Sequence, residues 1–255
     1  MKANYHTHTF RCRHAQGQDR DYADSAMANG FSELGFSDHV PYPYETYVPP
    51  YRMLMTDKDA YMRAIHDLKQ EYAGRIRILT AFECECVPRF RGYLTELKEQ
   101  VDYLILGNHG AESLPDYRYS GANTQPEHIK EYTRSTLMGM EWGIFSYLAH
   151  PDLTLHSYYV FDDAAKDMSR QICRAARVLK LPLEYNLNGV YNHLNMKDAL
   201  GYPCRHFWEI AAEEGVTAIM GVDAHSPAAF AWPEWDTGLE FLKTLGIPVL
   251  EKLPL

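Results

Sequence analysis

Histidines and acidic residues in this chain follow the ends of short apolar segments. His6 and His8 close the first of these segments, and Asp223 and His225 close the last. Side chains two positions apart on an extended chain point to the same side, so each pair could clamp one ion. Clustered imidazoles with few carboxylates suit Zn, Fe or Mn better than Ca or Mg, which prefer oxygen ligands. The spacing therefore predicts a transition-metal site drawn from both ends of the chain.

The same placement recurs at the segments between these two pairs, where the residues are Asp38, His39, Glu83, His109 and His150. A lone histidine is more often a hydrogen-bonded loop or core residue. We expect that role for the histidines away from segment ends, which are His66, His128, His156, His193 and His206. Recurrence at segment ends instead favours ligands, enough for two or three ions that share a bridging carboxylate. Glu83 is the natural bridge, and Glu85 shares its face.

The elements that must position these residues alternate between strand and helix patterns. Brief apolar runs predict strands at 3–7, 33–38, 76–83, 103–107, 147–149, 182–186 and 217–221. Apolar residues at helical spacing predict helices at 57–72, 91–99, 126–142, 164–180, 204–214 and 237–245. This rhythm is typical of an α/β barrel of parallel strands. In such a barrel all carboxyl ends of the strands open on one face, where the predicted ligands would converge.

A proline- and tyrosine-rich segment at 41–51 follows the second predicted strand. Its prolines exclude a helix or a central strand, so we expect a long loop. Such a loop either packs its aromatic rings on the rim of the barrel or forms a lid or wall for a substrate, because it lies on the face where barrels place their active sites.

Length and composition limit the classes of protein that remain. The 255 residues suit one domain spanning 1–255, and 46% hydrophobic and 23% charged residues are ordinary for a folded globular chain. A formal charge of -9 without any basic run argues against nucleic-acid and membrane partners. No apolar leader or spanning segment is evident, and five irregularly spaced cysteines favour reduced thiols, so we expect a cytoplasmic protein. No feature indicates an oligomeric state.

Six ordered motifs together resemble the PHP (polymerase and histidinol phosphatase) superfamily. They are His6-Thr7-His8-Thr9, Ser37-Asp38-His39, Phe82-Glu83-Cys84-Glu85, Gly107-Asn108-His109, Leu148-Ala149-His150-Pro151 and Gly221-Val222-Asp223-Ala224-His225-Ser226-Pro227. The early Phe10-Arg11-Cys12-Arg13-His14-Ala15 and the chain length resemble the stand-alone histidinol-phosphate phosphatases of histidine biosynthesis. The resemblance implies a distorted (β/α)7 TIM-like barrel with its metal site at the carboxyl ends of the strands.

The resemblance also implies how the ligands divide among two or three divalent ions of Zn, Fe or Mn. His6, His8, Glu83 and Asp223 would hold the first ion, and Glu83 would bridge to a second that also takes His109 and His150. His14, His39 and His225 would hold the third. Asp19 or Asp21 could take the place of His14, because family members often carry an aspartate near this position.

The activity that the resemblance implies is hydrolysis of L-histidinol phosphate to L-histidinol and phosphate. A hydroxide bridging two of the ions would attack phosphorus, with Glu83 and Asp223 as the catalytic carboxylates. Asp223 or a metal-bound water would protonate the leaving alkoxide. The candidate contacts to phosphate and substrate are Arg11, Tyr117, Arg118, Asn186, His193 and Arg205.

Two other functions remain open at this stage. A histidinol phosphatase is expected to carry an arginine shortly after the glycine that corresponds to Gly189, but this chain continues with Val190. The substrate could therefore be another small phosphoester, such as a nucleotide, a sugar phosphate or phosphotyrosine. A catalytically idle, metal-stabilised scaffold is the alternative from a different class. Every predicted metal position is filled, which favours an enzyme acting on a small-molecule phosphoester.

Overall fold

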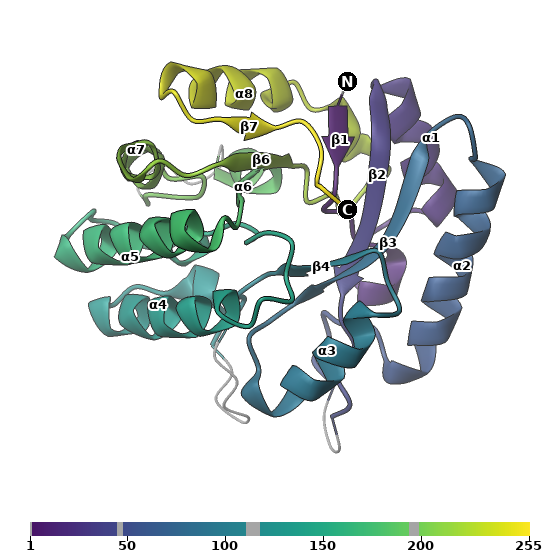
Figure 1. Ribbon diagram of the computed structural model, residues 1–255, viewed down its shortest axis with the longest axis horizontal. Coiled ribbons are helices and arrows are strands. Elements are labelled where there is room, and N and C mark those ends of the chain that lie inside the picture. Colours follow the sequence, from purple (N-terminus) through teal and green to yellow (C-terminus); the bar gives the residue numbers. More distant parts are fainter. Residues whose placement is uncertain (1, 45–47, 111–117, 194–198) are drawn as a thin grey trace.

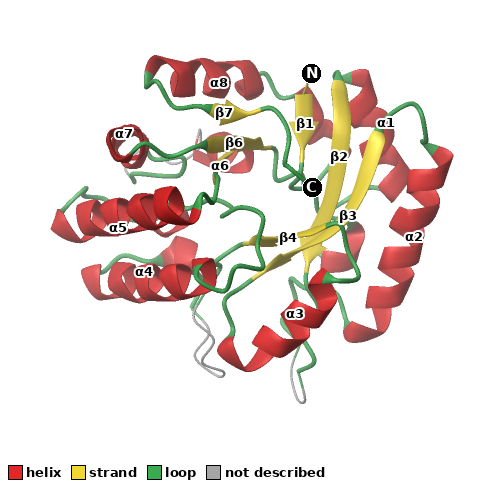
Figure 2. Cartoon of the chain, in the orientation of Figure 1, coloured by secondary structure: helices red, strands yellow, loops and turns green. Residues whose placement is uncertain are grey.

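Parallel strands alternate with helices along the chain in the computed structural model, which describes residues 2–44, 48–110, 118–193 and 199–255 (Figure 1). The strands are β1 (Lys2–Asn4), β2 (Phe31–His39), β3 (Arg77–Cys84), β4 (Tyr103–Leu106), β5 (Leu183–Asn186), β6 (Ala218–Gly221) and β7 (Val249–Leu250). The helices are α1 (Asp19–Ala28), α2 (Lys58–Glu71), α3 (Arg91–Lys98), α4 (Pro126–Met140), α5 (Asp163–Leu179), α6 (Leu187–His193), α7 (Arg205–Glu214) and α8 (Glu234–Thr244). Figure 2 shows most of the helices arranged around the strands.

Two parallel sheets, β1-β2-β3-β4 and β5-β6-β7, meet edge to edge to form a distorted barrel. Leu148 joins them on one side, because it forms parallel bridges with both Leu106 and Leu183. The strand predicted at 147–149 is therefore present in place, although it pairs through a single residue. On the other side a bridge between Thr7 and Ala224 links the segment after β1 to the segment after β6. The predicted TIM-like barrel is confirmed.

Alternation along the strands separates two cores. Residues of the strands also pack against the helices, and β1, β3, β4 and β6 contribute to a smaller cluster of buried residues: Ala3, Tyr5, Leu79, Ala81, Tyr103, Ile105, Tyr147, Ala149, Ile219 and Leu253. Because side chains alternate with a period of two, Glu83 continues the row of Leu79 and Ala81 in β3. The strand thus aims this acid at the end of the smaller cluster.

Three elements differ from the prediction, and several boundaries shift, most at the end of β1, which stops at Asn4 rather than at residue 7, and at the start of α8. Helix α1 is absent from the predicted helices because alanines make up most of its apolar residues, and it packs through Tyr22, Ala23 and Ala26. Helix α6 begins directly after β5, in a stretch for which the sequence predicts neither a helix nor a strand. Strand β7 has two residues, too few for a visible alternation. Helix α8 begins at Glu234, three residues before the predicted start, because Pro233 and Glu234 are typical of a first turn.

The proline- and tyrosine-rich segment forms no helix or strand in its described parts, 41–44 and 48–51. Tyr42 is buried and its ring stacks 4.9 Å from that of Phe90, as expected for rim packing. Tyr51 instead lines the cavity described below, as expected for a substrate wall. The segment thus packs one tyrosine in the interior and presents another to the cavity. Among the described residues, none of the helices has the length and apolar character needed to cross a bilayer.

Candidate metal centre

Strand register brings the predicted ligands to one end of the barrel. In the β2·β3 pair His39 lies directly opposite Glu83. The segment after β1 pairs with the segment after β6, where the amide of His8 donates to the carbonyl of Ala224 at 2.9 Å. That pairing places His6 and His8 beside Asp223, although more than two hundred positions separate them in the chain.

Glu83 stands at the centre of five imidazoles. The nearest ring nitrogens are His150 Nε2 at 2.8 Å, His39 Nδ1 at 3.0 Å, His109 Nε2 at 3.2 Å, His6 Nε2 at 3.5 Å and His8 Nε2 at 3.6 Å. Both carboxylate oxygens take part, since Oε1 faces His6, His109 and His150 while Oε2 faces His8 and His39. A carboxylate with imidazoles gathered around each oxygen has the arrangement of a bridging ligand.

Asp223 forms a second centre next to the first. Its Oδ1 lies 3.1 Å from His8 Nε2, 3.4 Å from His225 Nδ1 and 3.5 Å from His6 Nε2. Its Oδ2 accepts hydrogen bonds of 3.2 Å from the side-chain amides of Asn186 and Asn188. The two amides fix the carboxylate plane, which leaves Oδ1 directed at the histidines.

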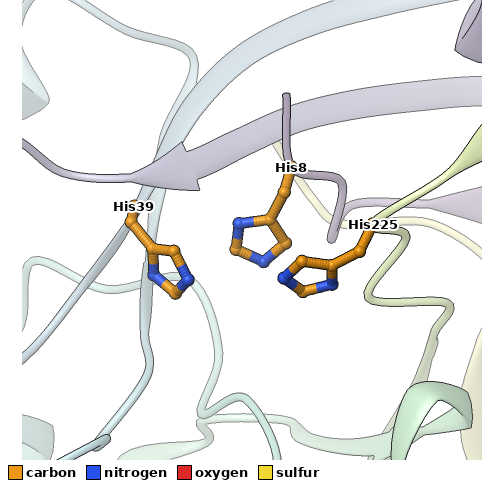
Figure 3. Close-up of side chains that lie close together, drawn as sticks. All are labelled: His8, His39 and His225. Carbon is orange, nitrogen blue, oxygen red and sulfur yellow. The ribbon is translucent and has the colours of Figure 1, made fainter. Parts of the chain in front are cut away.

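His14, His39 and His225 gather on the remaining side, next to His8. The Nε2 atoms of His14 and His225 lie 3.0 Å apart, and the rings of His8 and His225 stack with centroids 4.1 Å apart. Figure 3 shows His8, His39 and His225 converging from three different segments. Asp19 and Asp21 lie elsewhere: Asp19 pairs with Arg11, and Asp21 caps the start of α1. The structure therefore brings His14, and neither aspartate, to this side.

Electrostatics divides the histidines into two groups. Burial opposes ionisation of Glu83 and Asp223, but the surrounding imidazoles outweigh it and hold the pKa of each acid well below its ordinary value. Burial likewise opposes protonation of His109, but Glu83 and Glu85 raise its pKa to about 9. In contrast, burial and then His8 lower the pKa of His225 to about 3, and the same causes lower the pKa of His14 and His39. This last group is neutral at pH 7, the form in which a histidine binds metal.

Carboxylates outside the predicted ligand set lie behind three of the imidazoles. Glu184 Oε1 is 2.8 Å from His6 Nδ1, Glu85 Oε1 is 2.9 Å from His109 Nδ1, and Asp38 Oδ1 is 3.5 Å from His8 Nδ1. Such partners fix the ring orientation and tautomer of metal-binding histidines. Sequence reasoning named Glu85 and Asp38 as neighbours but missed Glu184. An acid in the middle of the otherwise buried strand β5 was the available signal.

Two of the predicted ligands have a backbone conformation that non-glycine residues rarely adopt. His150 has φ 28° and Asp223 has φ 51°. Positive φ costs about 1–3 kcal/mol at a non-glycine residue and concentrates at functional sites, where the surroundings enforce it. The backbone conformation that directs these two side chains therefore lowers the stability of the folded state.

A cavity of about 490 Å³ opens over the cluster. Its wall contains His8, His14, His39, His109, His150, Asp223 and His225, together with Tyr51, Tyr119, Leu153, Asn188, Asn192 and Tyr202. Apart from the predicted ligands, the described lining is aromatic, aliphatic or amide. The volume suits a small molecule, and the mixed wall offers stacking surfaces and a few directed polar groups.

The arginines proposed as phosphate contacts are not among the described residues of this wall. Arg11 makes two hydrogen bonds to Asp19, Arg118 pairs with Glu131 on the surface, and Arg205 pairs with Glu209. Each of the three arginines is thus paired with a carboxylate that is near to it in the sequence. Asn186 is buried and supports Asp223 from behind. Tyr117 and the side chain of His193 lie outside the described residues.

The polar atoms at the centre fit metal ions. Buried atoms without a hydrogen bond in the described part of the chain include His6 Nε2, both ring nitrogens of His8, His39 Nδ1, Glu83 Oε2 and Asp223 Oδ1. Unsatisfied buried polar atoms are costly, and here they converge in groups of three residues. In each group the possible ligand atoms lie within 4.8 Å of one another. Four such groups are His8/His39/His225, His6/Glu83/His150, His6/His8/Asp223 and His39/Glu83/His109. Mixed nitrogen and carboxylate donors at these separations can bind several transition-metal ions.

Comparison with known proteins gives the same picture. The family model described as PHP domain matches residues 4–188. A probable histidinol-phosphatase of Deinococcus radiodurans is 28% identical, covering 87% of this chain and 85% of that protein, and one of Schizosaccharomyces pombe is 25% identical, covering 89% and 81%. The crystal structure of a histidinol phosphate phosphatase from Lactococcus lactis, complexed with Zn, L-histidinol and phosphate, is 17% identical with a TM-score of 0.75, over 100% of this chain and 99% of that one. The last similarity shows a shared fold.

Proposed function

The chain belongs to the PHP domain family, and from that premise we propose that it is a metal-dependent phosphomonoesterase that hydrolyses L-histidinol phosphate to L-histidinol and phosphate. The observation that carries the proposal is the convergence of imidazoles on Glu83 and Asp223 beneath one small-molecule cavity. Relatives named histidinol-phosphatase that align over most of both chains support the choice of substrate.

The ligands divide among the ions as the sequence motifs suggest. His6, His8, Glu83 and Asp223 would hold one ion, Glu83 with His109 and His150 a second, and His14, His39 and His225 a third. Close contacts of His39 with Glu83 and of His8 with His225 connect these groups. When bound, such ions lower the pKa of a water molecule and draw charge from phosphoryl oxygens, which favours in-line attack at phosphorus.

Asp223 is the residue that we assign to proton transfer. Its carboxylate is ionised, Asn186 and Asn188 donate to Oδ2, and the residue lines the cavity. From this position Asp223 would accept the proton of the attacking water and return it to the leaving alkoxide as the phosphorus–oxygen bond breaks. Glu83 keeps its charge throughout, because the imidazoles around it favour the carboxylate form.

The rest of the cavity would receive the organic part of the substrate. Tyr51, Tyr119 and Tyr202 present aromatic surfaces, and Asn188 and Asn192 present amides that hydrogen-bond each other at 3.2 Å. An imidazole ring can stack on the former and a small amino alcohol can hydrogen-bond to the latter. We place the enzyme in the cytoplasm, a location supported by five cysteines that are all buried and unpaired.

The direct test is phosphate release from L-histidinol phosphate, measured beside nucleotides, sugar phosphates and phosphotyrosine, with protein reconstituted separately with Mn, Fe and Zn. We expect catalytic efficiency above about 10⁴ per molar per second on histidinol phosphate alone, which lies in the ordinary enzyme range. Asp223→Asn should lower kcat by about 10²-fold or more, because the amide cannot accept the proton.

Other results would change the assignment. Comparable release from several phosphomonoesters would keep the metal-dependent phosphoesterase and discard the substrate. Metal binding without turnover of any phosphoester would indicate the scaffold function instead.

A further inference from the structure

His109 has a defined partner on each ring nitrogen. Its Nε2 faces Glu83 Oε1 at 3.2 Å, and its Nδ1 lies 2.9 Å from Glu85 Oε1. Glu85 follows the end of β3 and is 3% exposed, so this contact is made away from water. A histidine held through one nitrogen presents the other in a fixed direction, which is how outer partners control a metal ligand.

Glu85 is in turn held by a buried arginine. Arg52 Nη2 lies 2.5 Å from Glu85 Oε1, the same oxygen that receives His109 Nδ1. Arg52 is only 2% exposed, and its Nη1 donates to the carbonyl of Val40 at 2.8 Å. The guanidinium therefore uses two donors in fixed directions, one to the backbone beside β2 and one to the acid.

Arg52 also connects the cavity wall with a second part of the centre. It follows Tyr51, which lines the cavity, and its guanidinium lies 5.0 Å from the ring of Tyr42. Its own carbonyl accepts hydrogen bonds from Arg13 Nε at 3.0 Å and Arg13 Nη2 at 2.7 Å. Arg13 precedes His14 in the chain, so Arg52 also contacts the residue next to a second histidine of the centre.

We propose that Arg52 is a positioning residue, which acts through Glu85 to hold His109 in the ring orientation that directs Nε2 towards Glu83 and the ion bound there. A lysine could reach Glu85 or Val40 with a compact point charge, but not both with the planar geometry of a guanidinium. Arg52→Lys should therefore retain part of the function, whereas Arg52→Met should lose it.

The metal arm of the test requires no substrate. Parent protein, R52M, R52K and the control R170M are titrated with Mn or Zn in metal buffers, and bound ions are counted by mass spectrometry. Arg170 also makes two ion pairs, with Glu213 and Glu214, but on the outer surface of α5. We expect R52M to bind its weakest ion about 10–100-fold less tightly, R52K to fall in between, and R170M to match the parent.

A purely structural role would give a different result. R52M would then melt earlier with or without metal but would hold the same number of ions with unchanged affinity, and that outcome would overturn the proposal. If R52M does not fold, R52K decides the question, because it keeps a positive charge beside Glu85. It should show a partial loss of the weakest ion, and parent-like ion binding by folded R52K would reject the proposal.

The kinetic arm rests on the proposed function. With L-histidinol phosphate, R52M should show a lower kcat that rises towards the parent value when Mn or Zn is supplied in excess. An inactive parent protein would refute the proposed substrate while the metal arm still decided the role of Arg52. A low kcat that excess metal does not restore, with parent-like ion binding, would overturn the positioning role.

Discussion

At the scale of single residues, the centre depends on acids placed behind the imidazoles. Glu184 is fully buried in β5 and faces three parts of the cluster: Oε1 meets His6 Nδ1, and Oε2 accepts from the amide of His150 at 3.1 Å and from Asn186 Nδ2 at 2.8 Å. One carboxylate thereby contacts the ring of His6, the strained backbone of His150, and the amide that supports Asp223.

We expect Glu184→Gln to weaken metal binding and phosphate release by about 10–100-fold, because an amide replaces a charged partner of His6. If the new amide nitrogen took the place of Oε2, it would also face the side-chain NH2 group of Asn186, which is itself a donor. Metal titration together with kcat measures the loss. Glu213→Gln on the exposed surface of α7 serves as the matched control. Unchanged metal affinity in folded Glu184→Gln would contradict the assigned role.

At the scale of elements, two strand pairs repeat one arrangement. Glu83 in β3 lies opposite Ile105, and two residues beyond Ile105 the chain has Gly107. Glu184 in β5 lies opposite Ile219, and two residues beyond Ile219 the chain has Gly221. A Cβ at Gly107 would lie 2.0 Å from Glu83 Oε1, and one at Gly221 would lie 1.9 Å from Glu184 Oε1. Each glycine leaves the space into which the acid of the neighbouring strand extends.

Alanine at either glycine should therefore displace the acid and disable the centre. We expect Gly107→Ala and Gly221→Ala to lower bound metal and kcat by at least about 10-fold, since movement of a support changes the ligands it holds. Gly92→Ala is the control: it lies in α3 with no atom within 4 Å of the added Cβ, and alanine favours a helix by up to about 1 kcal/mol. Parent-like metal content in both strand variants would show that the acids have room to move.

At the scale of the whole molecule, the last residues of the chain close the opposite end of the barrel. Glu33 in β2 accepts hydrogen bonds from Tyr5 at 2.6 Å and from Lys252 at 2.7 Å. Tyr5 also accepts the backbone N–H of Leu253 at 3.1 Å, and Leu253 is buried in the smaller core. Burial opposes ionisation of Glu33, but the hydrogen bonds from Lys252 and Tyr5 outweigh it and lower its pKa.

This lowered pKa predicts a pH-dependent contribution to stability. A carboxylate with a lowered pKa in the folded state stabilises it fully above the ordinary value of about 4.3, and the contribution disappears as pH falls through the lowered value. We expect Glu33→Gln to reduce the free energy of unfolding by about 2 kcal/mol at pH 7. Urea denaturation of chelator-treated parent and variant should show the difference shrinking below about pH 4. A difference that stays constant into acid would contradict the ionic origin.

Metal removal should affect the molecule as a whole. The ligands come from the segments that follow nearly every strand, so bound ions connect the two halves of the barrel. We expect a chelator to abolish phosphate release and to lower the melting temperature. Ions that bind only the folded state stabilise it by mass action, and their removal takes this contribution away. Adding back Mn, Fe or Zn should restore both. An unchanged melting temperature after verified metal loss would show that the barrel is stable without the ions.

The sequence by itself determined most of the alternating strands and helices, apart from α1, α6 and β7, and the residues that gather at the metal centre. Both follow from local signals: apolar periodicity defines the elements, and parallel strands in a barrel must open on one face. Only the tertiary structure decided which groups support those residues. Glu184 and Arg52 are adjacent to His6 and Glu85 in space but not in the chain. The structure likewise decided that Arg11, Arg118 and Arg205 pair with nearby carboxylates outside the cavity, because packing sets the direction in which each arginine side chain points.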